Sequence, residues 1–92
     1  MEDIIRQIRA EVVRAQDLHP EWPTDPMHAL AIVSEEYGEF AKAVLQTVYE
    51  YPKSTPDDIE EEAIQMAAMA VRFLLSMDKY YLWKSRQHEQ VA

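Results

Sequence analysis

The sequence predicts an all-α protein, a small antiparallel bundle of three to four helices that forms one domain over residues 1–92. Three observations lead to this fold class. The chain contains one glycine, Gly38, whereas a β-rich fold of this size needs several glycines at its turns. Apolar residues recur at steps of three and four, the period of an amphipathic helix, and no segment keeps the strict alternation of a half-buried strand. The chain is also too short for two domains.

The first predicted elements are a helix over residues 2–18 and an ordered loop over residues 19–26. The helix follows from the spacing of its apolar side chains, which are Ile4, Ile5, Ile8, Val12 and Ala15. The loop contains three prolines. Each proline removes a backbone donor and disfavours helix at the residue before it, so helix cannot continue here.

A second helix is predicted over residues 27–50. Asp25 followed by Pro26 is typical of an N-cap residue and the first helical position. Residues 51–54 contain another proline and end this helix. The break is short, so the helices on either side of it are expected to be antiparallel neighbours.

A third helix is predicted from Pro56 to about Met77. Thr55 provides its cap, and Asp57 and Asp58 suit the positive end of the helix dipole. Small side chains along this helix allow a neighbouring helix to come close; they are Ala63, Ala67, Ala68 and Ala70.

A fourth helix is predicted to follow Asp78 and to run over residues 79–90. Because no glycine or proline separates it from the third helix, one bent continuous helix is the alternative. A bundle this small buries only about 60% of its surface. The aromatic residues Tyr80, Tyr81 and Trp83 exceed what such a core needs, so we expect a homodimer or a larger homo-oligomer.

The net charge of −8 argues against nucleic acid as a partner, because the field of the chain repels phosphates. No apolar run approaches the roughly 18 residues of a membrane span, so no membrane partner is expected. The absence of cysteine excludes disulfides and zinc-thiolate sites. The N-terminus lacks the apolar core of a secretory signal, which predicts a cytoplasmic protein.

Most of the negative charge lies in one segment. Residues 35–62 contain nine acidic and two basic residues, so this segment alone carries −7. An even scatter of charges would suit a generic solubilising surface, whereas a concentrated acidic segment predicts a bound cation.

The oxygen-bearing side chains of this segment form two groups. Glu35, Glu36 and Glu39 lie on the second predicted helix, and Glu62 and Gln65 lie on the third. Residues three or four apart share a helix face, so the groups meet where antiparallel helices face each other. Mg²⁺, which prefers carboxylate oxygens and phosphates, would offset the repulsion between the carboxylates. The alternative is that these glutamates are the solvated face of two helices.

Two features favour the cation site over a solvated face. Gly38 lies between Glu36 and Glu39, where a glycine costs about 1 kcal/mol relative to alanine, and we expect it to permit a close approach. The apolar run at residues 63–70 is typical of a buried helix. It places Glu62 at the border of the core.

Residues 35–39 read E-E-Y-G-E and residues 62–65 read E-A-I-Q. The first segment resembles the E-E-x-x-E element of the MazG-like, all-α nucleoside triphosphate pyrophosphohydrolases, and the second resembles their E-x-x-D element. The resemblance covers roughly residues 26–77 and implies a MazG-like helical fold. It also implies the hydrolysis of nucleoside or deoxynucleoside triphosphates to the monophosphate and pyrophosphate, assisted by Mg²⁺, with Mn²⁺ as a substitute.

Carried over residue by residue, the resemblance implies that Glu36, Glu39 and Glu62 bind Mg²⁺, with Gln65 at the fourth ligand position. Glu35 would orient or deprotonate the attacking water. Gln65 departs from the family pattern, because it replaces a charged aspartate with a neutral amide. This change predicts weaker metal binding, with the loss of one ion where the family uses two. Gln65 is either the normal ligand of this branch of the family or the sign of a degenerate site.

Four further residues are candidates for binding the nucleoside triphosphate substrate. Trp22 is placed to stack on a base and His28 to reach one end of the site, whereas Lys42 and Arg72 are placed to contact phosphates. Each has a structural alternative. Trp22 would anchor the proline-rich loop, His28 would contact a helix end, and the two cationic residues would form ion pairs within their helices.

The sequence therefore predicts a Mg²⁺-dependent nucleoside triphosphate pyrophosphohydrolase. The alternative is a catalytically silent helical dimer of the same fold that acts as a binding or regulatory module, and Gln65 keeps this alternative open.

Overall fold

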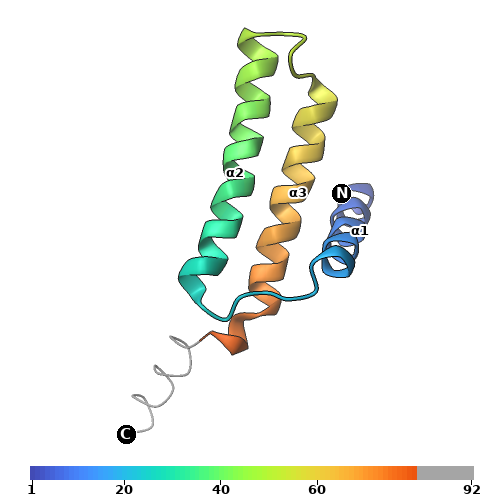
Figure 1. Ribbon diagram of the computed structural model, residues 1–92. Coiled ribbons are helices and arrows are strands. Elements are labelled where there is room, and N and C mark those ends of the chain that lie inside the picture. Colours follow the sequence, from blue (N-terminus) through green and yellow to red (C-terminus); the bar gives the residue numbers. More distant parts are fainter. Residues whose placement is uncertain (81–92) are drawn as a thin grey trace, which may run out of the picture.

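Three helices and a short 3₁₀ turn make up residues 1–80, the part of the chain that the computed structural model describes (Figure 1). The helices are α1 (Glu2–Leu18), α2 (Pro26–Tyr49) and α3 (Pro56–Leu75), followed by η1 (Met77–Lys79). Residues 1–80 contain no strand, which confirms the all-α prediction and its first three helices.

The predicted caps begin the second and third helices. The Asp25 Oδ1 atom accepts a hydrogen bond of 2.9 Å from the backbone N–H of Met27, and Pro26 occupies the first turn. At the start of α3 the Asp58 carboxylate accepts a 2.9 Å hydrogen bond from the backbone N–H of Thr55. These bonds satisfy donors that a helix start leaves unpaired, so both helices begin where the local sequence specifies.

α3 lies between the other two helices, antiparallel to α2 and in contact with α1 on its other side (Figure 1). The core is centred on four buried residues, Val12, Ala15, Ala68 and Met69, against which Ile8, Trp22, Ile32, Val33 and Val71 pack. Ala68 has no exposed surface, in agreement with the close approach predicted for the alanine-rich helix. The core is therefore located where α1 crosses α3.

The loop between α1 and α2 is tied to α3. An Arg72 Nη2 atom donates a 2.7 Å hydrogen bond to the His19 carbonyl, and the Arg72 guanidinium lies 4.9 Å from the centre of the Trp22 ring. These contacts confirm an ordered loop and show that Trp22 anchors it.

The end of α3 differs from the prediction. α3 ends at Leu75 rather than near Met77, and Tyr80 has an extended backbone, so the continuous-helix alternative is wrong as far as residue 80. The last turn tightens because the Ser76 N–H bonds to the Phe73 carbonyl three residues earlier. The remainder of the predicted fourth helix, with Tyr81 and Trp83, lies outside the described residues.

Tyr80, taken above as surplus to the core, is only 3% exposed and packs within its own chain.

Many other apolar side chains remain at the surface, and no large side chain within residues 1–80 is fully buried. In the same part of the chain, no helix has both the length and the apolar character needed to cross a lipid bilayer.

Candidate carboxylate site and adjoining cavity

The acidic segments of α2 and α3 face each other. Burial raises the pKa of Glu62, and the negative charges of Glu36 and Glu39 on the facing helix raise it further. Burial also raises the pKa of Glu36, followed by the charges of Glu39 and Glu11. These shifts mark a set of carboxylates, contributed by different helices, that oppose one another's ionisation.

The hydrogen bonding of Glu62 adds to this electrostatic cost. Its Oε2 atom is buried and has no hydrogen-bond partner. A buried carboxylate oxygen without a partner favours either a proton or a cation, because both compensate the water that burial removes.

Glu39 and Glu62 line one hollow of about 230 Å³ between α2 and α3. Lys42 lines the same hollow, as do Lys53 from the turn between the helices and Asp58 from the start of α3. Both cationic and anionic side chains thus line a small polar space. A phosphate group could contact the lysines there while remaining next to the two glutamates.

A second, larger cavity of about 410 Å³ lies between α1, the proline-rich loop and α3, with Ile32 and Glu36 of α2 along one side. Trp22, Glu36, Gln65 and Arg72 line it, so the fold brings four of the predicted site residues to one space. Its volume lies within the range of small-molecule sites. Glu36 lines this cavity, and its negative charge raises the pKa of Glu62 in the hollow.

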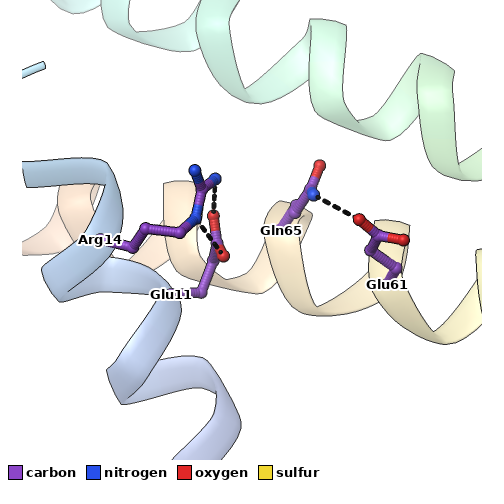
Figure 2. Close-up of polar contacts among 4 residues, drawn as sticks. All are labelled: Glu11, Arg14, Glu61 and Gln65. Carbon is purple, nitrogen blue, oxygen red and sulfur yellow. Dashed lines mark hydrogen bonds and ion pairs between the residues drawn. The ribbon is translucent and has the colours of Figure 1, made fainter. Parts of the chain in front are cut away.

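Gln65 lies toward α1 rather than beside Glu62. Its Nε2 atom donates a hydrogen bond of 3.5 Å to Glu61, and the paired Glu11 and Arg14 side chains of α1 lie across from them (Figure 2). Gln65 also lines a further hollow with Glu11, Arg14 and Glu61. The amide at the fourth ligand position therefore does not line the hollow that Glu39 and Glu62 share, although it lines the cavity that also contains Glu36.

Glu35 and His28 are both exposed on α2, His28 in its first turn. Glu35 is next to Glu36 and contributes to the raised pKa of that residue. The predicted ion-pair alternative for Arg72 is not what the structure shows, because within residues 1–80 its guanidinium contacts a backbone carbonyl and an indole ring rather than a carboxylate. Burial lowers the pKa of Arg72.

Two residues at the site were missed by the sequence reasoning. Glu11 projects into the group from α1, with a side chain only 14% exposed, and its charge acts on Glu36. A signal existed, because Glu11 lies on the same helix face as Ile8 and Ala15, where an apolar residue is expected. Tyr80 contacts Trp22 through its hydroxyl, and no local sequence pattern indicates this contact.

The expectation for Gly38 is wrong within residues 1–80. A Cβ atom placed on Gly38 meets no other atom within 4 Å, and the residue is exposed. No segment of the described chain approaches it, because this position of α2 faces away from α3.

The fit of the site to a metal ion depends on its donor atoms and on their arrangement. Among residues 1–80, no three histidine, aspartate or glutamate side chains are arranged so that they could hold one ion as they stand. The chemistry of the donor set does fit Mg²⁺, since the groups are carboxylate oxygens and the Oε2 atom of Glu62 lacks a partner. Binding therefore requires the side chains to turn toward a common point.

Comparison with known proteins adds no relative. No family model matches the chain, and neither the curated proteins nor the solved structures include a significant match.

Proposed function

We propose that this chain is a Mg²⁺-dependent nucleoside triphosphate pyrophosphohydrolase of the MazG-like class, with Mn²⁺ as a substitute metal. The observation that carries the proposal is the mutual repulsion of Glu36, Glu39 and Glu62 across the α2–α3 interface, with one buried oxygen of Glu62 unpartnered. The fold tolerates this repulsion at the two segments that resemble the family motifs. A divalent cation would relieve it.

Glu36, Glu39 and Glu62 would hold the metal, and Gln65 would reach it only by releasing Glu61. Bound Mg²⁺ supplies neutralisation of phosphate charge and a lowered pKa of coordinated water. The surrounding residues bind and orient the substrate. Lys42, in the hollow with Glu39, contacts the phosphates as a cation.

Glu35 is the proposed base. It accepts a proton from water as the water oxygen bonds to phosphorus and the anhydride bond between the α and β phosphates breaks. Pyrophosphate leaves with the electron pair of that bond, and the nucleoside monophosphate is the second product. The exposed position of Glu35 beside Glu36 gives it access to water at the edge of the site.

The nucleoside would occupy the cavity between α1 and α3. Trp22 offers an aromatic face there, and Arg72 offers a buried positive charge that, within residues 1–80, contacts a carbonyl and an indole ring rather than a carboxylate. His28, exposed in the first turn of α2, is proposed to contact substrate from the same end.

We further propose that the chain functions as a homodimer or larger homo-oligomer. Leu30, Leu74 and Leu75 are 49%, 67% and 61% exposed, and such side chains are normally covered when they cluster. Leu30 and Leu74 line one apolar hollow of about 310 Å³ with Val33, Ala70 and Phe73. A second copy of this chain is the proposed partner for that surface.

The test is a pyrophosphate-release screen over a panel of nucleotides with Mg²⁺ or Mn²⁺. We expect turnover by the parent, a loss of at least about a hundredfold in Glu39→Gln, and no change in Glu2→Gln, a matched control that removes an exposed carboxylate lining neither the hollow nor the cavity. The metal alone should stabilise the parent and so raise its melting temperature. At a metal concentration ten times the dissociation constant, the stabilisation is about 1.4 kcal/mol. Absence of both turnover and metal-dependent stabilisation would refute the proposal.

A second function is favoured by one observation, the engagement of Gln65 with Glu61 on the α1 side. A glutamine held there does not complete a ligand set, which suits a catalytically silent helical dimer that binds or regulates. Gln65→Asp separates the two functions. If only this variant releases pyrophosphate, the parent is the silent form; if the parent is already active, the glutamine is its working residue.

A further inference from the structure

We propose that Tyr80 is a positioning residue, and that its hydroxyl fixes the indole of Trp22 as one wall of the cavity between α1 and α3. The part of this inference that concerns substrate rests on the proposed function, because that cavity is where the nucleoside is placed. The part that concerns the wall itself stands on contacts alone.

The hydroxyl of Tyr80 is committed at both of its hydrogen-bonding ends. It accepts a 2.8 Å hydrogen bond from the Trp22 Nε1–H and donates one of 3.1 Å to the Phe73 carbonyl. The Tyr80 ring is 3% exposed and lies 5.0 Å from the Phe73 ring, centre to centre. Because the hydroxyl proton is directed at the Phe73 carbonyl of α3, the lone pairs of the hydroxyl oxygen face the indole N–H.

The face of the same indole is held by Arg72. The guanidinium lies 4.9 Å from the ring centre and is itself fixed by its bond to the His19 carbonyl. The Trp22 indole therefore contacts Tyr80 at its edge and Arg72 on its face. Trp22 and Arg72 line the 410 Å³ cavity, whereas Tyr80 supports the wall and is not among the residues that line it.

Removal of the hydroxyl leaves the indole N–H without its partner and frees the ring to adopt other rotamers. A ligand that packs against the ring then meets a less ordered wall, and its binding weakens. The reacting phosphates lie near Glu39 and Lys42, so the chemical step is unaffected. Loss of such a hydrogen bond predicts an increase in KM of roughly five- to tenfold with kcat within about twofold of the parent.

The experiment uses the full chain with Trp83→Phe, so that Trp22 is the remaining tryptophan. In this background Tyr80→Phe keeps the ring and removes the hydroxyl. Tyr51→Phe, at a position 67% exposed in the turn between α2 and α3, is the matched control. We expect Tyr80→Phe to move Trp22 emission to longer wavelength and to increase its quenching by acrylamide about twofold, since an unanchored indole becomes more accessible to water. Tyr51→Phe should change neither.

A folded Tyr80→Phe variant with unchanged emission and quenching would overturn the proposal. If quenching rises while KM stays at the parent value, the wall does not position substrate, and that part is overturned. If Tyr80→Phe does not fold, Trp22→Phe removes the same hydrogen bond together with part of the aromatic wall, and it must raise KM by at least the same factor. When both singles fold, the double variant should be no worse than Trp22→Phe alone. A parent without turnover refutes the proposed function, whereas the quenching comparison still decides the contact between Tyr80 and Trp22.

Discussion

Glu62 is a residue at which the acidic site has an electrostatic cost, because it combines partial burial, unlike its exposed neighbour Glu61, with repulsion from two carboxylates of the facing helix. Folding raises its pKa above the ordinary value of 4.5, and it raises that of Glu36 as well. The folded state thus binds protons more readily than the unfolded state. The stability from these groups is fully present below the ordinary pKa and is lost as the pH rises through the raised values.

The neutral isostere Glu62→Gln should therefore stabilise the metal-free protein at neutral pH, by roughly 2–5 °C in melting temperature. When the pH is lowered toward about 5, the difference in melting temperature between the variant and the parent should become smaller, because the carboxylates of the parent become protonated. Circular dichroism melts at both pH values measure the effect. Glu60→Gln, an exposed change on the same helix, is the control. Its melting temperature should change between the two pH values by the same amount as that of the parent. A lower melting temperature for Glu62→Gln at neutral pH would contradict the assignment of repulsion at this residue.

Individual site residues could be predicted from the sequence only as far as helix periodicity allows. The pairing of Glu36 with Glu62 follows from two short motifs and one short turn, and the structure shows their interaction. The direction of Gln65 does not follow, since a position one turn from Glu62 borders both neighbours of a central helix. Which side it takes depends on the packing of α1, and the Glu11–Arg14 pair occupies that side.

At the scale of elements, the beginnings of α2 and α3 and the extent of α1 agree with the prediction because their signals are local. Asp25 and Thr55 cap helices whose first residue is a proline, so propensity and hydrogen bonding agree at the same position. The end of α3 has no such signal. The chain after it is held by Tyr80, whose contacts with Phe73 and Trp22 involve residues 7 and 58 positions away in the chain.

α2 also contains a testable element-scale feature, the exposed glycine in its middle. Because a Cβ at Gly38 meets no atom within 4 Å, Gly38→Ala should stabilise the helix by about 0.5–1 kcal/mol. Chemical denaturation measures the change. Ala31→Gly, the reverse change at another exposed position of α2, is the matched control and should destabilise by a similar amount. Destabilisation by Gly38→Ala, or a fall in oligomeric mass, would instead show that another chain approaches the glycine closely.

At the scale of the whole molecule, the described chain buries few large side chains. Its fully or nearly buried apolar residues are mostly alanines, whereas Leu30, Leu74 and Leu75 remain open to solvent. The sequence predicted this shortage from the length of the chain. It could not predict which face would be left uncovered, because that depends on how far α1 covers α3. The uncovered apolar hollow lies between α2 and α3.

If this hollow joins two copies, one substitution places a charge on both sides of a symmetric contact. Leu30→Glu should therefore weaken association by at least about 3 kcal/mol, or more than a hundredfold, because a carboxylate buried without a partner is costly. Light scattering at micromolar concentration should give a mass of at least two chains for the parent and of one chain for Leu30→Glu. Val13→Glu changes a residue of similar exposure, 52%, on α1 and should leave the mass unchanged. If the parent is monomeric, or if both variants dissociate equally, the α2–α3 hollow is not the contact between copies.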